Sequence, residues 1–109
     1  MHELSLMEDL VTTIEQKVER GRVAAVHLEI GRLSAVVPDA LRFCFEVCAQ
    51  GTRLEGAELC VREVPGRARC RACGAEQEID LLPPPCACGS IELQVIAGRE
   101  LRLEGVEVI

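Results

Sequence analysis

The sequence predicts an α+β fold in which a small sheet with two helices is interrupted by an inserted zinc-ribbon domain. Two observations on periodicity and one on composition predict it. Two segments repeat apolar residues at helical spacing, and several others alternate apolar with polar residues as strands do. After Pro65-Gly66 the chain becomes rich in charged residues and cysteine. We therefore expect residues 1–65 and 99–109 to form the helix-and-sheet domain and residues 66–98 to form the ribbon.

The first helix is expected over residues 6–20. Its apolar residues recur every three or four positions and share one face: Leu4, Met7, Leu10, Val11, Ile14 and Val18. Ser5 followed by Glu8 is a capping-box pattern, which makes Ser5 the expected N-cap and leaves residues 1–4 ahead of the helix. Gly21 is expected just past the C-terminal end.

The second helix is expected to begin at Pro38, which suits a first helical turn, and to end before Gly51. Strands are expected at 23–30, 57–64, 91–96 and 99–109. The last of these follows the cysteine-bearing module and rejoins the first sheet. In the first strand, Val26, Leu28 and Ile30 share one face; His27 lies on the opposite face and is expected to be solvated.

The net charge of −6 opposes general nucleic-acid binding, because such binding relies on Lys and Arg to displace counterions from phosphates. Phe43 and Phe45 are the only aromatic residues, so base stacking is not expected. Arg67, Arg69 and Arg71 surround the first cysteine pair. They support an alternative function, a zinc-ribbon adaptor that binds nucleic acid or protein.

No segment approaches the length of about 20 apolar residues needed to cross a membrane, and the N-terminus lacks the features of a signal peptide. The chain has an odd number of cysteines, seven, and four of them lie in two close pairs. This arrangement suits reduced, metal-bound thiolates better than a disulfide framework. A cytoplasmic protein is expected.

The two close pairs are Cys70-Arg71-Ala72-Cys73-Gly74 and Cys86-Ala87-Cys88-Gly89. Two thiol pairs on a loop-rich segment are what a tetrahedral zinc site needs, so Cys70, Cys73, Cys86 and Cys88 are the expected zinc ligands. The second pair is one residue shorter than C-x-x-C, which makes Cys86 the least regular of the four. A site closed by four cysteines leaves no position for water, so this zinc would be structural, and a zinc hydrolase is not expected.

The other three cysteines have simpler interpretations. Cys44 and Cys48 lie four apart on one face of the second helix and could bind a metal, but we expect them to be small buried residues. Cys60 lies opposite Leu59 and Val61 on its strand, and no role is assigned to it.

A second metal site is expected at the N-terminus. The amine of Met1, the backbone nitrogen of His2 and the imidazole of His2 can form adjacent chelate rings on one ion, and Glu3 supplies a fourth position. Nitrogen ligands in a square plane suit Ni(II) or Cu(II). A histidine at position 2 is a weak signal by itself.

Five segments together resemble the HypA/HybF family of hydrogenase nickel-insertion proteins. They are MHELSLMEDLV, IGRLSAVVPDALRFCFE, GTRLEGAEL, the ribbon CRACG with CACGS, and GRELRLEGVEVI. The similarity runs in one order over nearly the whole chain. It is much more specific than either metal motif alone.

The resemblance implies a nickel metallochaperone, not an enzyme, that serves the maturation of nickel-iron hydrogenase. Nickel would bind at Met1, His2 and Glu3, and zinc in the ribbon. Its implied partners are the GTPase HypB, the hydrogenase large-subunit precursor and, in some organisms, urease maturation factors. A homodimer is compatible with the sequence, and neither nucleic acid nor a membrane is an expected partner.

The resemblance also implies zinc ligands at the positions of this chain that match the cysteines of the family. Cys70 and Cys73 match the first pair of the family, and Cys88 matches the last cysteine before Gly89-Ser90. The family usually has C-P-x-C-G-S at the second pair, whereas this chain has Pro85 before Cys86. The family fold implies two helices on a small sheet whose last strand follows the zinc insertion, in agreement with the periodicity.

Overall fold

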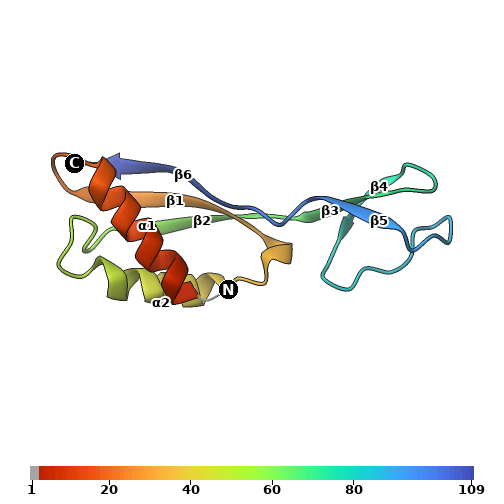
Figure 1. Ribbon diagram of the computed structural model, residues 1–109, viewed down its shortest axis with the longest axis horizontal. Coiled ribbons are helices and arrows are strands. Elements are labelled where there is room, and N and C mark those ends of the chain that lie inside the picture. Colours follow the sequence, from red (N-terminus) through yellow and green to blue (C-terminus); the bar gives the residue numbers. More distant parts are fainter. Residues whose placement is uncertain (1–2) are drawn as a thin grey trace. The chain divides into compact units, whose positions relative to one another are not determined.

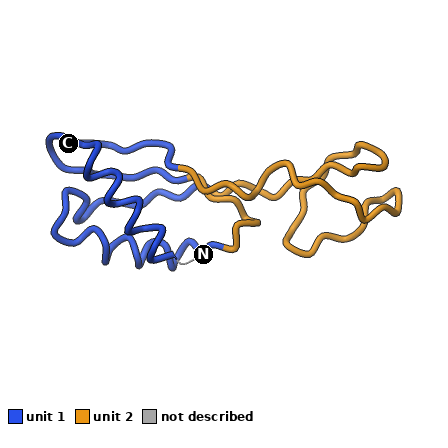
Figure 2. Tube along the Cα trace, in the orientation of Figure 1, with its two compact units in different colours: residues 1–28, 36–62, 103–109 blue, residues 29–35, 63–102 orange. Residues whose placement is uncertain are grey.

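The computed structural model describes residues 3–109, so the predicted nickel ligands Met1 and His2 lie outside the described residues. The chain forms two compact units (Figure 2). Unit 1 consists of residues 1–28, 36–62 and 103–109, and unit 2 consists of residues 29–35 and 63–102. Within residues 3–109, none of the helices has the length and apolar character that crossing a membrane requires.

Two helices and a three-stranded sheet form the first part of the fold (Figure 1). The helices are α1 (Glu3–Lys17) and α2 (Pro38–Ala49), which pack against each other. The strands are β1 (Val23–Gly31), β2 (Glu58–Val64) and β6 (Leu101–Val108), in the order β2-β1-β6. The C-terminal strand therefore lies beside the first strand, and the predicted α+β class is confirmed.

The core of unit 1 follows the predicted periodicities. Its buried apolar side chains come mainly from both helices and from β1, with Leu54 added from the loop after α2: Met7, Val11, Ile14, Val26, Leu28, Leu41, Phe45 and Leu54. Spacings of three and four along the helices and of two along the strand bring their buried side chains to one side of each element. Phe45 is enclosed, whereas Phe43, two residues earlier on α2, is 67% exposed.

Helix α1 begins earlier than predicted, at Glu3, so Ser5 is a helical residue and the N-cap assignment is wrong. Leu4 extends the apolar spacing of Met7 and Val11, which favours helix before Ser5 despite the local capping pattern. The helix also ends earlier, at Lys17. Gly21 adopts φ +81° in the loop before β1, where a Cβ would lie 2.4 Å from the carbonyl oxygen of Ile109.

The face of β1 that carries His27 is more enclosed than expected. Ala25 and Glu29 on that face are buried, and only His27 is partly exposed, with its Nε2 3.4 Å from a carboxylate oxygen of Glu107. Arg102 donates a hydrogen bond to the buried carboxylate of Glu29. Side chains of the neighbouring strand β6 therefore contact this face of β1.

Unit 2 contains a second three-stranded antiparallel sheet in the order β4-β3-β5. Its strands are β3 (Gly66–Cys70), β4 (Glu76–Ile79) and β5 (Leu93–Ala97), and a 3-10 turn, η1 (Arg32–Ser34), belongs to the same unit. Of these three strands, only the region of β5 was expected from the sequence. The pairing of β3 with β5 places Cys70 opposite Leu93, close to the second cysteine pair.

Gly98 lies where unit 2 has no room for a side chain. Its φ is +105°, and an added Cβ would lie 2.5 Å from the Cα of Gly66. Gly98→Ala should therefore lower the free energy of unfolding by at least about 2 kcal/mol, since a left-handed conformation and a backbone clash both oppose alanine. Urea denaturation measures the change. Gly105→Ala is the matched control, because a Cβ there meets nothing within 4 Å; equal losses in both variants would contradict the prediction.

Candidate metal centre

The structure brings all four predicted ribbon cysteines together. Cys70 ends β3, Cys73 lies in the turn that follows, and Cys86 and Cys88 lie in the turn before β5. Their Sγ atoms all lie within 4.8 Å of one another. The two shortest pairs cross between the turns: Cys70 Sγ is 3.6 Å from Cys88 Sγ, and Cys73 Sγ is 3.6 Å from Cys86 Sγ.

These separations fit one tetrahedral ion. Zinc to sulfur bonds of about 2.3 Å place the sulfurs of a regular tetrahedron about 3.8 Å apart. The 3.6 Å pairs are close to that edge length, and the remaining pairs lie under 4.8 Å, so small shifts would close the tetrahedron. Four thiolates around a closed tetrahedral position are typical of a structural zinc site.

Tight turns hold each cysteine pair. The amide of Gly74 donates to the carbonyl of Cys70 at 2.9 Å, and the amide of Gly89 donates to the carbonyl of Cys86 at 2.8 Å. Gly74 and Gly89 have φ of +78° and +94°. Glycine adopts this conformation without the steric cost of a Cβ. The short second pair therefore forms a turn of its own, and Cys86 lies buried within it.

The pKa values of two cysteines in the cluster are shifted in opposite directions. The backbone amide of Cys73 has the largest effect on Cys70 and, with other hydrogen bonds, lowers the pKa of Cys70 to about 6 against the opposing effect of burial. The backbone amide of Ala75 lowers the pKa of Cys73, but the surrounding sulfurs outweigh it and raise this pKa to about 11. Cys70 is thus the first thiolate that the cluster offers to a cation at neutral pH.

The arginines near the first pair are largely engaged with acidic side chains. Arg69 forms an ion pair with Glu76 at 2.9 Å, and Arg67 lies 4.0 Å from the same carboxylate. One carboxylate therefore faces two of the three arginines on which the adaptor interpretation relied. This arrangement disfavours a basic patch for nucleic acid.

Of the three predicted nickel ligands, the structure describes Glu3 alone. Glu3 is the first residue of α1 and is partly buried. Its carboxylate accepts a hydrogen bond of 3.4 Å from the amide of Val37, just ahead of α2. The side chain of Glu3 thus links the start of α1 to the start of α2.

The cysteines outside the ribbon are not buried as expected. Cys44 and Cys48 on α2 are both half-buried, so their predicted role as enclosed small residues is wrong. Burial and the neighbouring Glu58 raise the pKa of Cys60 on β2, which is also half-buried.

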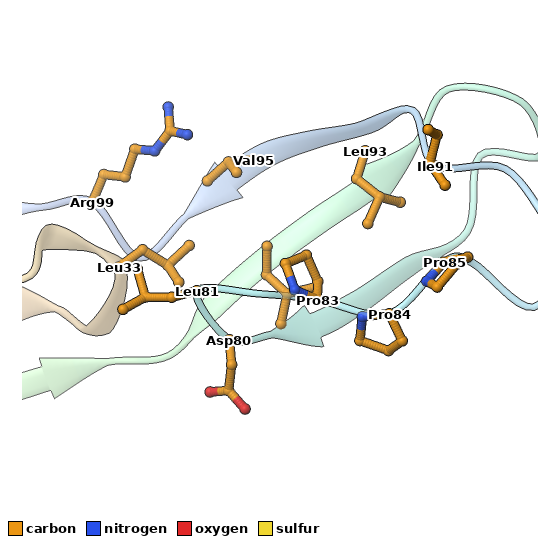
Figure 3. Close-up of a pocket in the computed structure, with 11 residues that line it drawn as sticks. Leu33, Asp80, Leu81, Pro83, Pro84, Pro85, Ile91, Leu93, Val95 and Arg99 are labelled. Atoms are coloured by element: carbon orange, nitrogen blue, oxygen red, sulfur yellow. The ribbon is translucent and has the colours of Figure 1, made fainter.

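Unit 2 contains an apolar groove of about 340 Å³ that was not predicted from the sequence (Figure 3). Apolar side chains of η1, the end of β4, the segment between β4 and β5, and β5 itself line it: Leu33, Ile79, Leu81, Pro83, Pro84, Pro85, Ile91, Leu93 and Val95. Asp80 and Arg99 also line it, and Figure 3 shows both of their charged groups pointing outward. The only sequence signal was the apolar run from Leu81 to Pro85 within a charged module.

Comparisons with known proteins agree on one family. The family model described as hydrogenase/urease nickel incorporation, metallochaperone, HypA matches residues 1–108. A hydrogenase maturation factor HypA from a Nostoc species is 46% identical over 108 residues, covering 99% of this chain and 96% of that protein. The same factor from Geobacter metallireducens is 48% identical and covers 99% of both chains.

A solved structure shares the fold. The solution structure of the Ni metallochaperone HypA from Helicobacter pylori matches with a TM-score of 0.67 at 23% identity, covering 100% of this chain and 98% of that one. The family match over residues 1–108 does not favour the alternative of a zinc-ribbon adaptor for nucleic acid or protein. The chain therefore belongs to the HypA family of hydrogenase and urease nickel-incorporation metallochaperones.

Proposed function

We propose that this chain carries Ni(II) on Met1, His2 and Glu3 and delivers it to a nickel-iron hydrogenase during maturation, while Cys70, Cys73, Cys86 and Cys88 hold a structural Zn(II). The observation that carries the proposal is the match of residues 1–108 to a nickel-incorporation family, together with relatives named as hydrogenase maturation factors. We expect delivery to urease only where the organism makes that enzyme.

The chemistry of the N-terminal residues supports nickel as the cargo. In a protein that begins at Met1, the terminal amine, the His2 backbone nitrogen and the His2 imidazole close two chelate rings around one ion. Strong nitrogen donors in a plane match the square-planar preference of Ni(II). Glu3, which opens α1, adds the fourth ligand through its backbone nitrogen or its side chain.

The ribbon supports zinc in a different role. Four thiolates and no open position would make the bound ion a cross-link between the two turns and not a catalyst. We therefore assign the nickel site to residues 1–65 and 99–109 and the zinc site to residues 66–98. Seven free cysteines, four of them metal ligands, support a location in the reducing cytoplasm.

The proposed partners follow from the role of a carrier. A GTPase such as HypB would supply nucleotide hydrolysis, because this sequence has no G-x-x-x-x-G-K-[ST] phosphate-binding loop. The hydrogenase large-subunit precursor would receive the nickel. We accordingly propose a non-enzymatic carrier, which could act as a monomer or a homodimer.

Metal analysis tests this proposal directly. Untagged protein that begins at Met1 should hold one zinc and one nickel per chain after exposure to Ni(II) and removal of loosely bound metal. In an activation assay, the loaded protein should raise the activity of apo-hydrogenase, whereas His2→Ala should not. A loaded wild-type protein that leaves the hydrogenase inactive would reject the delivery role.

Nickel binding should weaken steeply with acid. The imidazole and the α-amine, with reference pKa values of about 6.5 and about 7.7 to 8.0, must both lose protons before they bind metal. As pH falls from about 7.5 to about 6, protons increasingly occupy both nitrogens, so the nickel affinity measured by calorimetry should drop while zinc stays bound. The same affinity at both ends of this range would mean that other ligands hold the nickel.

A further inference from the structure

The two cysteines of α2 are side chains that the proposed function leaves without a role. Cys44 and Cys48 are free thiols and half-buried. They stand four residues apart, so both side chains project from one face of the helix. Two ligands at positions i and i+4 of a helix can coordinate the same metal ion, as the histidines of an H-E-x-x-H helix do.

Cys48 opens onto a groove of about 670 Å³ between α1 and α2. Helix α1 lines this groove with side chains from one of its faces: Leu4, Glu8, Val11, Thr12, Glu15 and Gln16. Glu8 is exposed, so its carboxylate is free to move at the surface of the groove. A soluble ion would therefore reach the sulfur of Cys48 from solvent.

The charges around Cys48 favour a cation. Burial raises the pKa of the Cys48 thiol, and the negative charges of Glu8 and Cys44 raise it further. The two groups that act on Cys48 are thus a carboxylate and a second sulfur, which are also suitable metal ligands. When all three groups are ionised they repel one another, and a divalent cation among them converts that repulsion into attraction.

We propose that Cys44 and Cys48 form a second metal site for a thiophilic divalent cation, with the carboxylate of Glu8 as the third ligand. Among residues 3–109 the ribbon is the one group of at least three such side chains already gathered within 4.8 Å, so Glu8 must turn toward the sulfurs on binding. A fourth position faces solvent, which makes the ion exchangeable, unlike an ion closed in by four cysteines. Both thiols must lose their protons to bind as thiolates, so binding releases protons to the solvent.

Cobalt(II) is a suitable probe, because thiolate ligands give it a charge-transfer band in the near ultraviolet. The nitrogen ligands proposed at Met1 and His2 would not produce that band. The full chain is first loaded with one equivalent of Zn(II) and then titrated with Co(II), and metal analysis checks that the zinc is retained. We expect one equivalent of cobalt with a thiolate band and the release of protons into the buffer.

Matched variants assign the band. Cys44→Ser and Cys48→Ser should each weaken cobalt binding by at least about tenfold and halve the band at saturation, and the double variant should remove it. Glu8→Gln should weaken binding but keep the full band, because both sulfurs remain. Cys60→Ser is the control, since Cys60 is also half-buried but lies on β2; it should behave as the wild type. Circular dichroism verifies that each variant is folded.

Three results would overturn the proposal. The zinc-loaded protein could show no thiolate band, the band could survive in the double variant, or zinc could leave in proportion to the cobalt taken up, which would place the band in the ribbon. The test is independent of the nickel function, because His2→Ala should abolish nickel delivery and keep the cobalt thiolate band.

Discussion

Cys73→Ala should release zinc and disorder residues 67–97. Binding of a structural zinc contributes about 10 to 16 kcal/mol, whereas whole domains are stable by only about 5 to 15 kcal/mol. The sheet β4-β3-β5 has few buried apolar residues, chiefly Ala68 and Ile79, so it cannot replace that contribution. The variant should retain no zinc in metal analysis, and the amide resonances of residues 67–97 should collapse to the narrow range of an unfolded chain.

Unit 1 should survive the same substitution. Its core of Met7, Leu41, Phe45 and neighbouring side chains does not include the cysteine cluster. Cys60→Ala is the control, because it removes a thiol from outside the cluster and should leave the zinc in place. If Cys73→Ala kept one zinc per chain and the ribbon resonances stayed dispersed, three cysteines would be enough and the four-ligand assignment would fail.

The helices and β1 could be predicted because each buries apolar residues at a regular spacing. Val11 and Ile14, or Leu41 and Phe45, mark the inner face of a helix in the sequence itself. The start of α1 could not be predicted from Ser5 and Glu8. Their capping pattern is a local preference, and the burial of side chains on a longer helix outweighs it.

Strand β3 was not predicted because the residues at its buried positions, Gly66, Ala68 and Cys70, are small. Small residues carry little of the apolar signal that reveals a strand, although they allow close packing. Strand β4 has one buried residue, Ile79, which is too little for a periodic pattern. Strand pairing therefore decides both: β3 pairs with β5 over a long range and β4 pairs with β3, and a sequence does not display such pairing.

The zinc ligands could be predicted from spacing, since two close thiol pairs leave few alternatives. The sequence does not predict which sulfurs lie nearest one another. The pairs Cys70 with Cys88 and Cys73 with Cys86 depend on the register that sets β3 against β5. The exposure of Cys44 and Cys48 was also missed, because helical spacing shows which face a residue occupies but not how completely the neighbouring helix covers that face.

Adding one Gly before Met1 should abolish nickel transfer, although every native side chain stays in place. The extension converts the Met1 amine into an amide and moves the free amine one residue away. The two fused chelate rings that place amine, backbone nitrogen and imidazole around one ion are then lost. His2 becomes the third residue, however, and an amine-first chelate with histidine at position 3 can still hold Ni(II) in solution.

Affinity alone would therefore mislead, and the measurement must pair calorimetry with transfer of nickel to the GTPase partner. His2→Ala should lose both binding and transfer, because no imidazole remains near the amine. The Gly-extended protein should lose transfer even where it retains binding, since its ion sits in a different ring system that is displaced from α1. Glu55→Gln, in the loop after α2, changes none of the proposed nickel ligands; it is the control and should transfer normally. Full transfer from the extended protein would show that the terminal amine is dispensable and that side chains alone build the site.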